Sequence, residues 1–484
     1  MPNITVKWGK EKLSVDVDIN ESPLVFKSQL FALTSVPPDR QKIVVKGKTL
    51  SDSSWNGITL APGTMIMMMG SAEAVLEAPK AETNENSSTI QTPDGSEIRL
   101  VRGIKNLGNT CYMNSVIQSF LNIKEVGSAL ESYSAKSRSS ISDEITLALK
   151  HLNGELRSSS LTTAVAPLNM LQNLHRAMPQ FSERSNSGSF EQQDANECYV
   201  ELQRLCLKGL KDSGINIEKF FKGKFIISQK CLEDDSEPEQ TTSEDFFQLS
   251  CFLSAQVKYL QSGIKEKLTE EITKNSTTLS RDAKWSKKAL IERLPAYLSI
   301  QMVRFFYKES SKTSAKILKD VKFPMSLDMY DMCSPSLQAK LRPQREAIKL
   351  EEDAKVEQMR RIKVDEKSKV VENEDYDELP FSFPEDEGSN NSGFYELQAV
   401  ITHKGRASNG GHYVAWIKVE NKWVVCDDEE VQVVTPEQVL NLSGGGDWHT
   451  AYVLVYGPRI VRKYHDMSDS ENTPIAEPNA MSID

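Results

Sequence analysis

Cys111 is the residue whose surroundings best fit a nucleophile. Gly108 and Asn109 precede it and favour a tight turn, and Asn109 or Thr110 can cap a helix. Apolar side chains then recur at helical spacing, at Met113, Val116, Ile117, Phe120 and Leu121. Cys111 is therefore predicted to begin a largely buried helix, whose free N–H groups stabilise a thiolate, the reactive form. The alternative is a small cysteine packed in a core, but the turn and the helix start favour the nucleophile.

His412 is the histidine, of six in the chain, that best fits a general base. It begins a predicted strand over residues 413–419, which a turn connects to a second strand over 422–426. His412 and Asp427 lie nearly symmetrically about that turn, so a hairpin would place them on adjacent strands. The carboxylate of Asp427 would then orient the imidazole and stabilise its charged form, the third role in a catalytic triad. Asp428 is the alternative for this role.

The composition fits a globular protein with more than one structured unit. The 484 residues are 39% apolar and 26% charged, and the formal net charge is −10. We find no long basic stretch for nucleic-acid binding, no signal peptide, and no apolar run of the roughly 18 residues that a membrane span needs. The seven cysteines are odd in number and include no Cys-x-x-Cys pair. This favours a reduced cytoplasmic or nuclear protein without a disulfide framework.

The first 70 residues predict a small α+β domain. Its expected elements are a hairpin with its turn at Glu11 and Lys12, a helix and two further strands, over residues 3–7, 13–17, 23–34, 41–48 and 65–69. With Pro37-Pro38-Asp39 before the third strand, this order resembles a ubiquitin-like domain of the β-grasp fold. Gly70 is followed by Ser71 and not by a terminal second glycine. Residues 1–70 are therefore expected to be a docking module and not a conjugated modifier.

The rest of the chain divides into a linker, a larger domain and a tail. Residues 71–98 are rich in Ala, Glu, Asn, Ser, Thr and Pro, which predicts a flexible linker. The larger domain is expected over residues 99–458. Within it, residues 336–392 are predicted to be a disordered acidic insertion, with a solvated helix as the alternative for the alternating charges of 343–370. Residues 459–484 are predicted to be a disordered tail.

Three segments resemble the catalytic boxes of the ubiquitin-specific proteases. They are Asn106 to Ser115 around Cys111, Gly411-His412-Tyr413, and Asp427-Asp428. The resemblance implies an α+β fold, that of a papain-like cysteine protease with thumb, palm and fingers. By position it implies that Cys111 is the nucleophile, His412 the base and Asp427 the orienting acid. Asn106 matches the residue that stabilises the oxyanion, and Gly411 would let the substrate backbone approach closely.

A further motif, which runs from Phe190 to Glu197, resembles the Gln-Gln-Asp box of the same family. The resemblance implies that Asp194 and Gln193, together with Asp428, bind the substrate. The C-terminal tail of ubiquitin carries arginines, so an acidic residue such as Asp194 in the channel would have a clear use. The alternative is that Asp194 is a favourable acid at a helix N-terminus, and both can hold.

Most members of this family carry a four-cysteine zinc site in the fingers. Here Cys231 and Cys251 stand alone. We therefore expect no bound zinc, since a structural zinc site needs about four ligands, and no other cofactor.

The order of ubiquitin-like domain, linker and protease resembles the proteasome-associated members of the family. This implies that ubiquitin and ubiquitinated proteins are the substrates, and that residues 1–70 bind the regulatory particle of the 26S proteasome in cytoplasm and nucleus. A non-catalytic adaptor is a second interpretation, but all three triad residues are present. A cysteine protease for another protein tail is a third, and Asp194 and the boxes argue against it.

Overall fold

The computed structural model divides into two compact units, Met1–Glu85 and Asn86–Asp484. In the first unit the structure describes residues 3–8, 11–17, 41–45, 48–51 and 64–69, with single positions between them. In the second unit it describes residues 89–464 except for 92–96, 136–139, 159–162, 185–187, 189, 309–312, 365–375, 406–409 and 447.

The N-terminal unit contains a five-stranded sheet in the order β2-β1-β5-β3-β4. Its strands are β1 (Asn3–Trp8), β2 (Glu11–Asp16), β3 (Lys42–Val45), β4 (Lys48–Thr49) and β5 (Met65–Met69). β1 and β5 pair in parallel, as in the expected β-grasp fold, and the helical residues Phe26 and Leu30 belong to the core. The predicted turn at Glu11 and Lys12 is wrong, because both residues lie in β2 and pair with β1.

The palm is an eight-stranded sheet that forms the centre of the second unit. Along the sheet its strands are β10 (Gln248–Phe252), β13 (Leu298–Val303), β22 (Thr450–Pro458), β18 (Phe394–Lys404), β19 (His412–Val419), β20 (Lys422–Asp427) and β21 (Glu430–Val434), with β16 (Ser326–Asp328) paired to β18. Every residue of β22 is buried, because layers of side chains cover both faces of the sheet at its centre.

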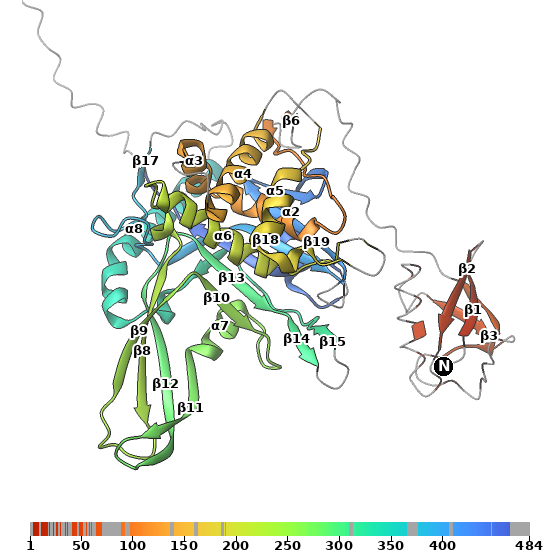
Figure 1. Cartoon of the computed structure of the whole chain (residues 1–484), viewed down its shortest axis with the longest axis horizontal. Helices are drawn as coiled ribbons and strands as arrows, with labels where there is room; N and C mark the ends of the chain where they lie inside the picture. Colours follow the sequence, from red (N-terminus) through yellow and green to blue (C-terminus); the bar gives the residue numbers. More distant parts are fainter. Residues whose placement is uncertain are drawn as a thin grey trace, which may run out of the picture. The chain divides into compact units, whose positions relative to one another are not determined.

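The thumb is a group of helices on one side of the palm (Figure 1). They are α2 (Cys111–Leu121), α3 (Lys124–Ser132), α4 (Ile141–Leu156), α5 (Leu168–Ala177) and α6 (Ala195–Asp212), with the short helices η2 (Pro179–Ser182) and η3 (Glu218–Phe220). α2 is the innermost, since all eleven of its residues are buried and it packs on β19 and α6. The predicted helical periodicity after Cys111 is confirmed.

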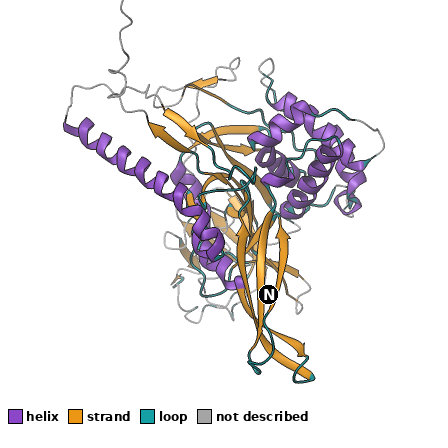
Figure 2. Cartoon of the chain, turned by 90° about the vertical axis from the view of Figure 1, so that its left-hand side faces the viewer, coloured by secondary structure: helices purple, strands orange, loops and turns teal. Residues whose placement is uncertain are grey.

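The fingers are a four-stranded antiparallel sheet that projects away from the thumb (Figures 1 and 2). In the order β11-β12-β8-β9, the strands are β11 (Thr269–Ser276), β12 (Arg281–Arg293), β8 (Gly223–Cys231) and β9 (Gln240–Phe246). α7 (Leu260–Leu268) lies beside their base and packs on β10. The other short elements are the hairpin β14 (Phe305–Lys308) and β15 (Thr313–Lys316), η4 (Tyr330–Met332), α9 (Pro436–Leu440) and η5 (Asn441–Ser443).

The acidic insertion is largely ordered, so the prediction of disorder over residues 336–392 is wrong for most of it, and the alternative of a helix over residues 343–370 is confirmed as far as Val364. Pro335–Val364 forms the long helix α8 (Figure 2), and Leu337 and Leu341 on its first turns are buried in the core of the palm. Asp386 forms a bidentate pair with Arg293. Composition indicated disorder because charged residues outnumber apolar ones, but the few apolar side chains lie at helical spacing and find a core. Residues 365–375 lie outside the described residues.

The two predicted flexible segments also contain strands. In the linker, β6 (Thr89–Gln91) pairs with β7 (Glu97–Arg99), while residues 70–88 lie outside the described residues. In the tail, β23 (Val461–Tyr464) pairs with β17 (Tyr376–Leu379) of the insertion. Residues 465–484 lie outside the described residues, so the rest of the tail stays a prediction.

Candidate active site

Cys111 is the first residue of α2, and the preceding turn fixes its position. Gly108 and Asn109 have φ angles of 98° and 53°, in the left-handed region that the turn requires. The side-chain oxygen of Asn106 accepts hydrogen bonds from the backbone N–H groups of Gly108 and Thr110, at 3.0 and 3.2 Å. The thiol is buried, with 2% of Cys111 exposed. A rigid turn therefore delivers this sulfur to the start of a helix, where N–H groups favour an anion.

His412 and Asp427 meet across the β19–β20 hairpin, as the sequence predicted. The hairpin pairs Ala415 with Cys426, and His412 Nε2 lies 2.5 Å from Asp427 Oδ1. The other ring nitrogen is left for the thiol of Cys111. Hydrogen bonds to Asp427 and to Cys111 raise the pKa of His412 to about 10, and the bond to His412 holds the pKa of Asp427 below its usual range. The imidazole therefore favours its charged form beside the sulfur.

Asp428 has a different role from Asp427. Its two carboxylate oxygens accept hydrogen bonds from the side-chain amides of Asn106 and Asn114, both at 2.8 Å. Its backbone oxygen accepts from the N–H of Ile104 at 2.7 Å. Asp428 therefore ties the end of β20 to the segment around Cys111, and it fixes the orientation of the Asn106 amide. The carboxylate that accepts a hydrogen bond from His412 is that of Asp427.

The Gln-Gln-Asp box brings to the sulfur a glutamine that was not among the predicted site residues. Gln192 is buried, and its Nε2 lies 3.9 Å from Cys111 Sγ, whereas the predicted Gln193 is half-buried. The backbone N–H of Tyr413 is a second donor, at 3.5 Å from the same sulfur. The sequence held no signal that separates the two glutamines, because both precede the helix start and only the packing decides which one points inward.

Asp194 is the N-cap of α6, which is the alternative given for it from the sequence. Its Oδ1 accepts from the N–H groups of Asn196 and Glu197, at 2.7 and 3.2 Å. Its Oδ2 accepts from the hydroxyl of Tyr452 on β22, at 2.6 Å. The carboxylate therefore joins the thumb to the palm, and each oxygen already has a partner within the chain.

Gly411 is required by the packing of the chain itself. Its φ is 121°, and a Cβ added there would lie 2.1 Å from the backbone oxygen of Lys404 and 2.7 Å from His403 Nε2. His403 is fully buried, and its Nε2 bonds the carbonyl oxygen of Gly410 at 3.1 Å. Burial lowers the pKa of His403 to about 3, so the ring is neutral and donates. Nothing near His403 in the sequence predicts this contact, so its role could not be inferred from the sequence.

The cysteines of the fingers and palm lie in separate apolar clusters. Cys231 packs with Ala283 and Trp285 near the tip of the fingers, and Cys251 lies in the palm core. Among the described residues, the group with metal-ligand spacing is His412, Asp427 and Asp428, whose side chains already bond one another or the two asparagines. The expectation of no bound zinc stays a prediction.

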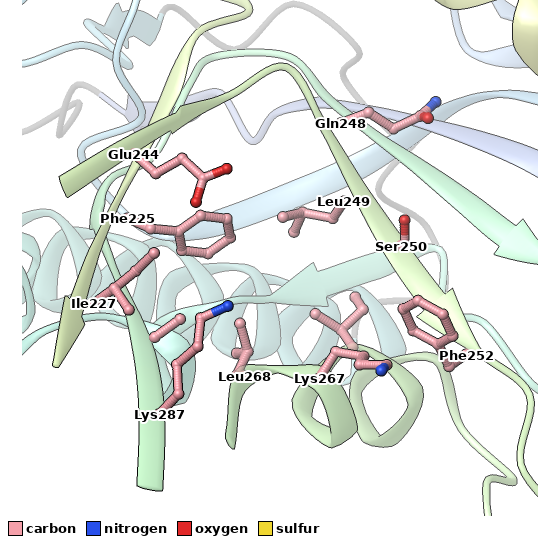
Figure 3. A pocket seen from close by; sticks show the side chains of 12 residues that line it. Phe225, Ile227, Glu244, Gln248, Leu249, Ser250, Phe252, Lys267, Leu268 and Lys287 are labelled. Atoms are coloured by element: carbon pink, nitrogen blue, oxygen red, sulfur yellow. The ribbon is translucent and has the colours of Figure 1, made fainter. Parts of the chain in front are cut away.

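A cavity of about 230 Å³ lies where the fingers meet the palm, away from the catalytic side chains (Figure 3). Its walls come from β8, β9, β10, α7 and β12, and Figure 3 shows Phe225 between Glu244 and Lys287. Cys111 and His412 are not among its lining residues. The triad therefore does not lie in this cavity.

A thiol on a buried helix, an imidazole and a carboxylate on an adjacent sheet are the parts of a thiol hydrolase of papain-like architecture. The sequence profile of the ubiquitin carboxyl-terminal hydrolases matches residues 102–456, and that of the ubiquitin family matches residues 4–73. The chain belongs to the ubiquitin carboxyl-terminal hydrolase family, with an N-terminal ubiquitin-like domain. It is a cysteine peptidase with ubiquitin C-terminal hydrolase activity.

Relatives from three kingdoms match nearly the whole chain. Ubiquitin carboxyl-terminal hydrolase 14 of Caenorhabditis elegans is 43% identical, over 96% of this chain and 95% of its own. Ubiquitin carboxyl-terminal hydrolase 6 of Arabidopsis thaliana is 37% identical, over 95% and 100%. The enzyme numbered 6 of Schizosaccharomyces pombe is 34% identical, over 94% and 98%.

The fold also matches a solved structure, that of the SAGA Ubp8/Sgf11/Sus1/Sgf73 DUB module bound to ubiquitin aldehyde. The TM-score is 0.52 at 22% identity, over 75% of this chain and 70% of that one. The match supports the thumb, palm and fingers fold. Within the described residues, every helix is too short or too polar to cross a membrane.

Proposed function

We propose that this chain releases ubiquitin from its conjugates through a thioester at Cys111. His412 takes the thiol proton, and the sulfur attacks the carbonyl carbon of ubiquitin's last glycine. His412 then protonates the leaving amine as the isopeptide bond breaks. Water, deprotonated by His412, attacks the thioester and frees the ubiquitin carboxylate and the thiol. The observation that carries this proposal is the bond of 2.5 Å between His412 Nε2 and Asp427 Oδ1, with Cys111 at the same imidazole.

Asn106 is our candidate for stabilising the oxyanion that forms during the attack. Asp428 accepts one of its amide hydrogens, so the amide is held in place and its second hydrogen can face the substrate. A donor fixed in advance contributes about 3–4 kcal/mol to such a transition state. Gln192, which lies 3.9 Å from the sulfur, is a second amide close to the reaction.

The channel for the ubiquitin tail is proposed to pass Gly411, Gln193 and Asp194. Gly411 offers a backbone without a side chain next to His412. Asp194 places a carboxylate at the junction of thumb and palm while it caps α6. It already accepts three hydrogen bonds, and its remaining lone pair can accept from an arginine of the tail, since a carboxylate accepts about four hydrogen bonds.

The proposed setting of this activity is the proteasome in cytoplasm and nucleus. The support is the ubiquitin-like domain at residues 4–73, which carries no conjugatable tail, and the seven cysteines, all of which are free thiols. The regulatory particle would hold the conjugate while the ubiquitin-like domain tethers the protease near it.

The test of catalysis is a ubiquitin probe with a C-terminal electrophile. Cys111→Ala should abolish labelling and hydrolysis, and Cys198→Ala, which removes another buried thiol from the thumb, should leave both nearly unchanged. Labelling that persists in Cys111→Ala would exclude this nucleophile. An adaptor would bind ubiquitin without labelling in the wild type, and a protease for another tail would react with that tail's probe in preference to ubiquitin's.

A further inference from the structure

Three methionines form an exposed row on β5 of the ubiquitin-like domain. Met65, Met67 and Met69 are 57%, 50% and 45% exposed, while Ile66 and Met68 between them are buried. In a strand, successive side chains point to opposite faces, so the three thioethers share the outer face of the sheet. We call Met65, Met67 and Met69 the methionine row. Among the described residues, these are the methionines that count as exposed.

The neighbours of the row combine apolar and basic side chains. On one side, Lys7 of β1 pairs with Met67, and Lys12 of β2 pairs with Lys7. On the other side, Val44 and Lys42 of β3 pair with Met67 and Met69. Cross-strand partners point to the same face, so these lysines border the row. The face would suit a partner that combines an apolar contact with carboxylates.

The net charge of the domain agrees with such a partner. Residues 1–70 contain 8 Lys and Arg against 6 Asp and Glu, a balance of +2, whereas the whole chain has a balance of −10. The remaining residues therefore hold −12, and the ubiquitin-like domain is the basic part of an acidic chain. Complementary charge speeds association and sets the orientation of the two partners. An acidic partner would therefore associate faster with this domain than with the acidic remainder of the chain.

We propose that the methionine row is a reversible oxidation site that controls docking through this face. The occupant is an acidic, apolar surface of the proteasome regulatory particle, so the inference rests on the proposed function. A peroxide transfers one oxygen atom to each thioether, giving a sulfoxide and water or alcohol, and the sulfur is oxidised by two electrons. Two thiols of a sulfoxide reductase system restore the thioether, with release of water and formation of a disulfide.

Oxidation would act on docking through polarity. A thioether is a flexible apolar group that packs on irregular surfaces, whereas a sulfoxide is polar and must be desolvated to enter the same contact. Three adjacent sulfoxides would turn the apolar centre of the face into a polar one. The lysines around it are unaffected by peroxide, so the charge attraction would remain while the close apolar contact is lost.

The first experiment maps oxidation on the full chain. The protein is treated with hydrogen peroxide for increasing times, and each methionine is followed by peptide mass spectrometry with fragmentation. Met65, Met67 and Met69 should oxidise at least about tenfold faster than Met68, which is 1% exposed in the same strand. Equal rates along the strand would contradict the exposed row and overturn the proposal.

The second experiment measures association with purified proteasome regulatory particle, in a Cys111→Ala background so that oxidation of the nucleophile has no part in the result. Peroxide should weaken association at least about tenfold, since burying a single apolar side chain can account for that much affinity. Dithiothreitol should not restore it, but a methionine sulfoxide reductase should.

Variants decide between the methionine row and other targets. The triple change Met65→Leu, Met67→Leu and Met69→Leu keeps an apolar face and should associate normally with or without peroxide, while the triple change to Gln should associate weakly throughout. Met68→Leu is the matched control and should stay sensitive. A Leu variant that still loses association after peroxide would overturn the inference.

Deleting residues 1–70 separates this inference from the proposed function. If the deletion leaves association unchanged, the docking role of the domain is wrong and the inference falls with it. If the deletion abolishes association but oxidation of all three methionines does not weaken it, the docking role stands and only the oxidation control is wrong.

Discussion

A carboxylate accepts several hydrogen bonds both in the catalytic centre and at the tip of the fingers, but the partners of the two carboxylates differ in how far away they lie in the sequence. Asp428 bonds Asn106 and Asn114, which precede it by 322 and 314 residues. Glu237 at the tip of the fingers accepts from Thr277 N–H and Oγ1 at 2.9 Å, from Thr278, and from Ser276, all about 40 residues away in the next hairpin. One carboxylate sets the geometry between segments more than 300 residues apart, and the other joins the turns of two neighbouring hairpins within the fingers.

The difference predicts separate consequences for mutation. A substitution in the long-range network should change the rate at which the chain reacts, because it moves catalytic atoms relative to one another. A substitution at the tip should change stability and leave the chemistry intact, because the turn contacts only the fingers. The variants below test this division.

The largest effect is expected for Asp427→Asn. An amide cannot stabilise the charged imidazole as a carboxylate does, so hydrolysis of a ubiquitin substrate should slow by about 10²- to 10⁴-fold. Because Asp427 is the first cause that raises the pKa of His412 to about 10, its loss should lower that pKa. The alkaline limb of the pH–rate profile should therefore move to lower pH.

Asp428→Asn is the matched control for that variant. It removes a charge that bonds Asn106 and Asn114 but leaves the His412 partner in place. We expect a smaller loss of rate and an alkaline limb at the position of the wild type. The reverse order of the two variants would assign the third triad role to Asp428.

A smaller effect is expected at His403, which holds the backbone just before His412. His403→Leu removes the donor to the Gly410 carbonyl. The backbone before β19 is then held less firmly, and the position of His412 at the start of that strand is less well fixed. We expect kcat to fall by about tenfold with little change in KM, since small misplacements of catalytic groups reduce the chemical step. His403→Gln can donate to the same oxygen and should recover part of the loss. If both variants unfold at the same lowered temperature and lose kcat equally, His403 is only a packing residue.

The sequence was sufficient where function depends on local pattern. The turn before Cys111 and the helical spacing after it predicted α2, and the symmetry of His412 and Asp427 about a turn predicted their hydrogen bond. These inferences need only contacts between near neighbours in a helix or a hairpin. The strands of the ubiquitin-like domain were predictable for the same reason, apart from the residues in the first turn.

The sequence was insufficient where a residue's role depends on tertiary packing. Gln192 reaches Cys111 across 81 residues, and which of two neighbouring glutamines turns inward is decided by the thumb and palm together. Asp194 bonds Tyr452 across 258 residues, a contact that no local pattern in the sequence predicts. The prediction of disorder for the acidic insertion was wrong for a related reason. Composition carries no information on the core into which Leu337 and Leu341 pack.

The smallest effect on catalysis is expected for Glu237→Gln at the tip of the fingers. Its hydrogen bonds to the hydroxyl and N–H donors of residues 276–278, first of all to Ser276, hold the pKa of Glu237 below its usual value. A group with a lowered pKa in the folded state stabilises the fold above its ordinary pKa, and this contribution is lost as the pH falls through the folded value. The wild type should therefore lose part of its thermal stability as the pH falls below 4.5, the ordinary pKa of this carboxyl, and Glu237→Gln should have a lower Tm at neutral pH and lack that acidic decline.

The reactivity of Cys111 should be the same in Glu237→Gln as in the wild type. A small thiol reagent such as iodoacetamide should alkylate Cys111 at the wild-type rate in Glu237→Gln, because the triad and the Asp428 network are intact. The substitution is nearly isosteric, so any loss should come from replacing an acceptor by a donor that faces hydroxyl groups. If alkylation slows together with the fall in Tm, the fingers and the catalytic centre are coupled, and the division between a local and a long-range carboxylate does not hold.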